Sequence, residues 1–444
     1  MSRLAAALLL ALAAPAAAAA APPMPDILPL RERAAVQDRW LAERLDALVP
    51  ALMRRDGVDM WILIAGEYNE DPVVRTMLPA TWLNARRRTI LVFHDRGPEQ
   101  GVERIAVTRY PAGTFASAWD PDAQPDQWAR LAQIVRERDP RRIAVNMSEE
   151  FPLADGLSAS QRDALVRALG PDHAARLVSP ERLSLGWLET RTPAEMAVYP
   201  QLLRITHAII AEGLSPAAIT PGVTTADDLR WWFRERVSKL GLSTWFHPSV
   251  NIQRPQQGTF SIATMGLASG EPIQPGDLIH IDFGISYLGL TTDNQRMAYV
   301  LRPGETEAPR GLREGMAAMS RLVDIHTSEM RAGRSGNATL AAIRARAARE
   351  GIEATIYTHP LGYHGHGAGA TIGLWDAQGG VPVKGDYPVE PNTAWSIELN
   401  AERAVPEWGG QKVRFMFEEN GWFDGRAFRF LNGRQTELIL IPGG

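Results

Sequence analysis

Two aspartates lie close together in the C-terminal half of the chain, within residues 279–294. Asp282 ends an apolar, strand-like run and precedes Gly284, and Asp293 follows 11 residues after Asp282. A β-hairpin would place the two carboxylates side by side, where they repel each other and resist ionisation. A pair of divalent metal ions about 3.5–4 Å apart removes that cost and is a known arrangement for hydrolysis. Taken alone, a turn aspartate and an unrelated exposed aspartate explain the pattern equally well.

A glycine-rich segment at residues 358–369 contains three of the nine histidines, namely His359, His364 and His366. Glycines leave room for a ligand to approach the backbone. Imidazole is the commonest protein metal ligand and can also transfer protons near neutral pH. A single histidine is more often an ordinary polar residue, but three in one such loop indicate a functional role.

Two glutamates complete the set of candidate ligands. Glu398 stands between two apolar residues in a strand-like segment, and Glu418 lies in a similar segment, where strand periodicity puts it on the opposite face from Glu419. Each glutamate alone is more often a surface charge. Four carboxylates with one imidazole form an oxygen-rich ligand set, which favours manganese, cobalt, iron or zinc over copper.

The elements that must position these residues repeat in order along the C-terminal half. Capping boxes at Thr192 and Thr225 predict the starts of two helices, a strand-rich stretch follows, and then the order repeats. Two rounds of helix, helix and strands suggest a duplicated α+β unit that packs its sheets together. The predicted helices cover 196–214, 229–240, 312–331 and 340–350, and the strands lie at 278–301 and around Ile356, Ser396 and Phe415.

The N-terminal half reads as a separate α/β domain that ends near residue 185. It contains no cluster of potential ligands or nucleophiles. The predicted helices cover 30–55 and 128–137, and the predicted strands cover 60–64, 89–93, 104–107 and 142–145.

The first 21 residues indicate export. Arg3 precedes a short apolar run and an alanine tract, which is typical of a signal peptide cut near Ala21. The run is shorter than the roughly 20 residues that span a bilayer, so no stable membrane insertion is expected, although a retained anchor is the alternative. The absence of cysteine excludes disulfides, thiolate metal sites and a cysteine nucleophile. A net charge of −4 argues against nucleic acid as a partner.

The order Asp, Asp, His, Glu, Glu resembles that of the metallopeptidases with the pita-bread fold, which include Xaa-Pro aminopeptidases, prolidases and methionine aminopeptidases. The Asp-x-Gly motif at Asp282, Ser-Ile-Glu at 396–398 and Phe-Glu-Glu at 417–419 are similar to that family's motifs. The resemblance covers residues from about 190 to the end. The two-domain layout is similar to the branch of aminopeptidase P, prolidase and creatinase.

The resemblance implies an α+β fold. This fold consists of a pita-bread (creatinase/aminopeptidase) catalytic domain at 189–444 and a smaller α/β domain at 22–188, which follow the signal peptide expected at 1–21 from the pattern described above. The resemblance also implies two divalent metal ions per chain, with Mn²⁺ as first choice and Co²⁺, Zn²⁺ or Fe²⁺ as alternatives. The predicted metal ligands are Asp282, Asp293, His366, Glu398 and Glu418, and the predicted catalytic residues are Glu398, His359 and His364.

Three departures from the family pattern leave alternatives open. His366 matches the family's His-Gly-x-Gly, whereas an alignment with a one-residue insertion makes His364 the metal ligand. The substrate-binding histidine expected upstream of Asp282 is missing around Met265, and His247 lies too far upstream for a gapless match. The strand before Glu418 also needs about two extra residues to align.

The function implied by the resemblance is hydrolysis of a small peptide, and the expected signal peptide places this activity in the periplasm or outside the cell. Such an enzyme would cleave N-terminal or dipeptide bonds, with Xaa-Pro as the expected substrate class, and would use a water activated by the metal pair. The alternatives are hydrolysis of a non-peptide C–N bond and a catalytically weak binding homologue. The sequence leaves open whether the chain forms a homodimer.

Overall fold

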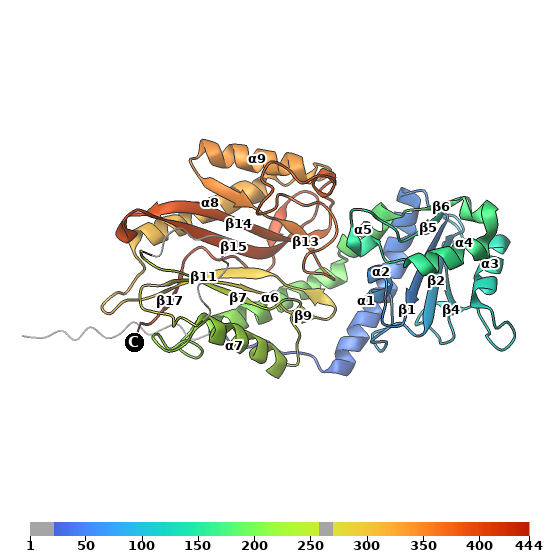
Figure 1. The fold of residues 1–444 in the computed structure, drawn as a ribbon, viewed down its shortest axis with the longest axis horizontal. Coiled ribbons are helices and arrows are strands. Elements are labelled where there is room, and N and C mark those ends of the chain that lie inside the picture. The colour runs from blue at the N-terminus through green and yellow to red at the C-terminus, as the bar shows by residue number, and fades with distance from the viewer. Residues whose placement is uncertain (1–21, 257–269, 444) are drawn as a thin grey trace, which may run out of the picture.

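The protein consists of two lobes that lie side by side (Figure 1). The structure is a computed structural model that describes residues 22–256 and 270–443. The predicted signal peptide and the region around Met265 lie outside the described residues. Within those described ranges, none of the helices is both long enough and apolar enough to cross a membrane.

The smaller lobe is a sheet of six strands, in the order β4-β3-β2-β1-β5-β6, with helices on both faces. Its helices are α1 (Leu30–Arg55), α2 (Pro72–Arg75), α3 (Gln127–Arg138), α4 (Ala159–Ala174) and α5 (Glu181–Glu189), and its strands are β1 (Met60–Gly66), β2 (Arg88–Asp95), β3 (Val102–Val107), β4 (Ala116–Ser117), β5 (Ile143–Val145) and β6 (Leu177–Val178). Side chains of β1 alternate between the two faces, so Trp61 packs with α1 and α5 while Ile62 packs with α3 and α4. The predicted α/β character of this half is confirmed, because each predicted helix and strand is present.

The larger lobe contains the two predicted rounds of helix, helix and strands. The first round comprises α6 (Pro193–Gly213), α7 (Ala226–Lys239), β7 (Ser249–Gln253), β8 (Leu278–Phe283), β9 (Ser286–Tyr287), β10 (Leu290–Thr291) and β11 (Asn294–Val300). The second comprises α8 (Arg310–Glu329), α9 (Gly336–Arg349), β12 (Glu353–Ile356), β13 (His359–Leu361), β14 (Thr393–Val405), β15 (Gln411–Phe423), β16 (Phe428–Phe430) and β17 (Ile439–Ile441).

The strands of the two rounds form one continuous sheet, in the order β12-β14-β15-β11-β8-β7. We expected two sheets packed against each other. Instead, β11 of the first round pairs with β15 of the second, at Gln295 and Glu418. Backbone hydrogen bonds therefore join the two halves edge to edge. This join brings ligands from both rounds onto one surface.

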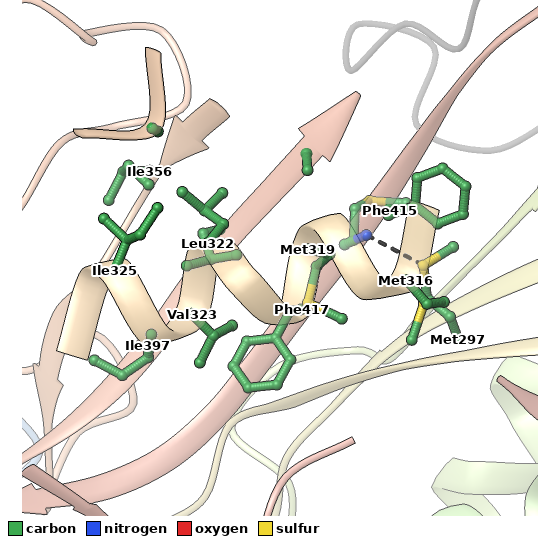
Figure 2. Packing of buried hydrophobic residues seen from close by; sticks show 14 of the residues in the cluster. Met297, Met316, Met319, Leu322, Val323, Ile325, Ile356, Ile397, Phe415 and Phe417 are labelled. Atoms are coloured by element: carbon green, nitrogen blue, oxygen red, sulfur yellow. Dashed lines mark hydrogen bonds between the residues drawn. The ribbon is translucent and has the colours of Figure 1, made fainter. Parts of the chain in front are cut away.

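Helices cover the outer face of both halves of this sheet, as Figure 1 shows, and this leaves the opposite face for the site. In the second half, Ile397 and Phe417 point outward and pack with α8, where Met319 and Val323 lie near them (Figure 2). Because side chains alternate along a strand, Glu398 and its neighbours on the other side of the pleat face inward.

Both predicted capping boxes are present at the starts of α6 and α7. The Thr192 hydroxyl accepts a hydrogen bond from the Glu195 backbone N–H, and the Glu195 carboxylate accepts one from the Thr192 backbone N–H at 2.7 Å. Thr225 and Asp228 form the same reciprocal pair at α7. These contacts satisfy N–H groups that a helix start otherwise leaves without partners.

A buried ionic cluster joins the two lobes. The Arg44 guanidinium on α1 lies 3.0 Å from Glu195 Oε2 on α6, and Arg191 lies 3.3 Å from Glu195 Oε1. All three side chains are fully buried. Removing one partner would leave a charge uncompensated inside the protein, which typically costs about 3–5 kcal/mol. The predicted domain boundary at 188/189 falls at the end of α5, next to this cluster.

Candidate metal centre

One row of paired residues crosses the inner face of the sheet and carries three of the four predicted carboxylates. Asp282 on β8 pairs with Gln295 on β11, Gln295 pairs with Glu418 on β15, and Glu418 pairs with Glu398 on β14. Glu419 points to the opposite face, as predicted, where it forms an ion pair with Arg296 and lies 3.1 Å from His207 Nε2.

Asp293 reaches this row through the loop that connects β8 to β11. A Cβ atom on Gly284 would lie 2.0 Å from the Thr292 carbonyl oxygen, so only glycine permits the two ends of the loop to approach so closely. The Asp293 backbone N–H then donates to Asn420 Oδ1 at 2.9 Å, which fixes it beside β15. The predicted hairpin therefore does bring Asp282 and Asp293 together.

Bringing these four carboxylates together lowers the stability of the metal-free folded protein, because the charged groups are partly removed from water and repel one another. Asp293 and Glu418 are buried, while Asp282 and Glu398 are half-buried. Burial, followed by the nearby negative charge of Glu418, raises the pKa of Asp282, Asp293 and Glu398 well above the ordinary range. Such a cluster is destabilising unless protons or cations neutralise it.

His359 on β13 faces the same carboxylates. Its Nε2 atom lies 3.8 Å from Asp293 Oδ2 and 3.7 Å from Glu418 Oε1. Its Nδ1 atom lies 3.0 Å from the Pro360 carbonyl oxygen, and since a carbonyl only accepts, Nδ1 carries the hydrogen. In the neutral ring, Nε2 therefore presents a lone pair towards the carboxylates, as a metal ligand does.

Two buried atoms support the fit of these residues to cations. Among the described residues, Asp282 Oδ1 and His359 Nε2 have no hydrogen-bond partner. Buried polar groups without partners are rare, and here each can donate an electron pair. The donor atoms lie within 4.8 Å of one another in three sets, which are Asp282–Asp293–Glu418, His359–Glu398–Glu418 and Asp293–His359–His366. The chemistry of these donors suits divalent ions that prefer oxygen and imidazole.

His366, the predicted nitrogen ligand, lies next to His359 on the exposed side of the site. The two rings are 4.9 Å apart, and His366 belongs to one of the three donor sets. Partial burial, followed by the charge of His359, lowers the pKa of His366 to about 4. The geometry favours His359 as the nitrogen ligand, because it shares donor sets with Asp293 and with Glu398 and Glu418. The assignment of His366 as a metal ligand stays a prediction.

His364 is not brought to the carboxylates. Gly365, which separates it from His366, packs so tightly on Trp245 that a Cβ atom would lie 2.1 Å from the indole ring. Trp245 thus stands between two cavities, and His364 lines the other one. Burial, followed by the charges of Arg191 and Arg75, lowers the pKa of His364 to about 4 there.

Two polar residues of the site were missed by the sequence analysis. Gln295 donates hydrogen bonds to Glu398 Oε1 at 2.8 Å and to Glu418 Oε2 at 3.1 Å, and His280 lies behind Gln295. Strand alternation could have found both, because each lies two residues from a predicted aspartate ligand and shares its face. His247 is exposed beside Arg234 and does not line the main cavity.

The row opens into a cavity of about 560 Å³. Its floor is polar and includes the metal-site carboxylates, while aromatic and aliphatic side chains form much of its wall. A second cavity of about 380 Å³ shares Tyr357 and His366 with the first, is also lined by His359, and reaches the smaller lobe at Phe151. The apolar wall residues of the main cavity are Trp245, Phe246, Tyr357, Trp375, Leu399 and Met416.

The fold is a two-lobed pita-bread scaffold, and its inner face carries a carboxylate-rich candidate metal centre. The sequence model of metallopeptidase family M24 matches residues 201–420, and the chain belongs to this family. No curated protein sequence matches the chain significantly.

Solved structures agree with the fold of both lobes. An X-Pro aminopeptidase from Thermotoga maritima aligns with a TM-score of 0.62 at 16% identity, covering 88% of this chain and 99% of that one. An Xaa-Pro dipeptidase from Bacillus anthracis aligns with a TM-score of 0.59 at 17% identity, covering 92% and 99%. The N-terminal domain of FACT complex subunit SPT16 from Cicer arietinum also aligns, with a TM-score of 0.55 at 9% identity, covering 93% and 98%. At these identities the matches establish the fold alone.

Proposed function

We propose that this protein is an exported metal-dependent peptidase that cleaves N-terminal or dipeptide bonds in small peptides, with Xaa-Pro as its substrate class. The observation that carries the proposal is the cluster formed by four carboxylates and His359, with the lone pairs of Asp282 Oδ1 and His359 Nε2 left without partners among the described residues. Membership of metallopeptidase family M24 supports the same reaction class.

Five residues would hold a pair of divalent ions, and Glu418 belongs to two of the three donor sets. When bound, such ions lower the pKa of a water molecule and polarise the carbonyl group that is attacked. The holding residues are Asp282, Asp293, His359, Glu398 and Glu418.

The remaining steps fall to side chains around this centre. Glu398 can take a proton from water and return it to the leaving amine, as the family resemblance implies. His366 is exposed at the junction of the two cavities, where it can hydrogen-bond to the substrate. The apolar cavity wall suits a proline ring or another apolar side chain and limits the access of water.

We expect peptidase activity that depends on added metal. Purified mature protein should be stripped with a chelator, reconstituted with Mn²⁺, Co²⁺, Zn²⁺ or Fe²⁺, and incubated with matched Xaa-Pro and Xaa-Ala dipeptides and tripeptides. Free amino acids are then measured by mass spectrometry. Activity should return only with metal, and Xaa-Pro substrates should be cleaved faster than their Xaa-Ala counterparts.

The same experiment separates the alternatives. Two bound ions without cleavage of any peptide would favour hydrolysis of a non-peptide C–N bond. A chain that binds no metal at all would favour a binding homologue and would contradict the proposed function.

We also propose that the protein is exported and trimmed near Ala21, on the basis of Arg3, the short apolar run and the alanine tract. Expression of the full chain in a Gram-negative host, followed by fractionation and N-terminal sequencing, tests this. The expected product is a periplasmic protein that begins close to Ala21. An intact Met1 in a soluble cytoplasmic fraction would refute export.

A further inference from the structure

A chain of hydrogen bonds runs along the floor of the main cavity and ends on two of the metal-site carboxylates. It begins at Asn251 on β7, passes through His280 on β8 and reaches Gln295 on β11. The side chains of all three residues are buried in the protein, and all three line the cavity. His280 belongs to none of the candidate metal-binding sets formed by the described residues.

The direction of every hydrogen bond follows from the carboxylate end. An ionised carboxylate only accepts, so Gln295 must turn its NH₂ group to Glu398 Oε1 at 2.8 Å and Glu418 Oε2 at 3.1 Å. The carbonyl oxygen of Gln295 then faces His280 Nε2 at 2.9 Å, and this nitrogen must donate. In a neutral ring Nδ1 is left as an acceptor, and Asn251 Nδ2 lies 3.2 Å from it.

We propose that Asn251, His280 and Gln295 are positioning residues that orient Glu398 and Glu418 for metal binding through this one-directional chain. The inference rests on the proposed metal-dependent function. Gln295 holds one oxygen of each glutamate and leaves the remaining lone pairs for cations. Because an amide is neutral, it fixes the carboxylates without cancelling the negative charge that attracts the metal.

The backbone register explains why these three residues can act together. Asn251 and His280 are direct partners in the β7–β8 pair, and Gln295 is the partner of Asp282 and of Glu418 in the two neighbouring pairs. The chain of hydrogen bonds is therefore built on three adjacent strands, of which β8 and β11 lie inside the sheet and β7 forms its edge. A rigid support of this kind holds ligands more accurately than a loop would.

The test is a double-mutant cycle read by Mn²⁺ affinity. Gln295→Leu keeps the volume and removes both donors, and we expect it to weaken Mn²⁺ binding by about 10–100-fold, the usual effect of losing an outer partner of metal ligands. His280→Phe should weaken binding less, because Gln295 remains but is no longer oriented. The double variant should match Gln295→Leu alone, since His280 acts only through Gln295.

Gln253→Leu is the matched control. Gln253 is also a buried glutamine of the same sheet, but it bonds to the backbone of Arg414 rather than to a metal-site carboxylate. It should keep wild-type Mn²⁺ affinity. Calorimetric titration with Mn²⁺ and the melting temperature of the metal-free protein are measured for every variant. If Gln253→Leu loses as much affinity as Gln295→Leu, general destabilisation explains the loss and the inference fails.

Two further outcomes would overturn the proposal. One is wild-type Mn²⁺ affinity in Gln295→Leu, and the other is a double variant whose loss of affinity equals the product of the two single losses. If Gln295→Leu does not fold, the double-mutant cycle uses Asn251→Ala and His280→Phe instead. The loss of Mn²⁺ affinity in their double variant should again be smaller than the product of the two single losses. Wild-type protein that binds Mn²⁺ but cleaves no peptide would refute the proposed reaction and leave this inference standing. Wild-type protein that binds no Mn²⁺ would refute both.

Discussion

Replacing Asp293 with asparagine should abolish metal-dependent activity and make the metal-free protein more stable. Asparagine keeps the shape but removes a negative charge that belongs to two of the three donor sets. The loss in metal affinity should exceed the roughly 100-fold that the loss of an outer partner costs, because a direct ligand is removed. Turnover and metal content per chain, measured on the same preparation, check this result.

The gain in stability follows from the raised pKa of Asp293. Folding raises this pKa above the unfolded value of about 3.9, so the folded metal-free protein loses stability as pH rises above about 4. The variant lacks that loss. Its advantage in melting temperature should be absent near pH 4 and should grow towards neutral pH, reaching at least about 2 °C.

The exposed Asp163 provides the control for this experiment. Asp163→Asn removes the same charge from the surface of α4, and it should change neither metal content nor turnover. Full metal occupancy and a wild-type rate in Asp293→Asn would show that the carboxylate cluster does not hold the metal. Lower stability of the metal-free Asp293→Asn protein at neutral pH would contradict the argument from charge repulsion.

Alanine variants of the three loop histidines should have three different phenotypes. His359→Ala should lose metal affinity by more than about 100-fold, with loss of activity as the consequence, because Nε2 faces Asp293 and Glu418. His366→Ala should keep most of its metal and lose about 10²–10⁴-fold in rate, as expected for a group that contacts the substrate or moves a proton. His364→Ala should keep both, because this side chain lines a different cavity.

Metal stoichiometry and turnover, measured side by side for the three variants, decide between the alignments of this loop. Loss of metal in His366→Ala with full metal in His359→Ala would restore the match to His-Gly-x-Gly. Loss of metal in His364→Ala would support the one-residue insertion. If all three variants keep metal and rate, the loop is not part of the site.

Local patterns in the sequence determined the elements and the types of ligand. The helix at residues 30–55 and the capping boxes at Thr192 and Thr225 depend on neighbours within a few residues, so they could be predicted and are present. The alternation around Glu418 likewise predicted its face correctly, because the pleat of a strand is a local property.

The tertiary structure alone decided how distant segments share the site. The pairing of β11 with β15 joins the two rounds into one sheet and places Gln295 opposite Glu418. These two residues lie so far apart in the chain that strand or helix periodicity, which relates only near neighbours, could not predict the contact. His359 reaches the carboxylates because β13 pairs with β14 opposite Ser396, whereas Trp245 separates His364 from them. The sequence by itself determined which residue types could bind metal. The register between strands and the packing of one indole ring decided which histidine faces the carboxylates, because both arise only when remote segments meet.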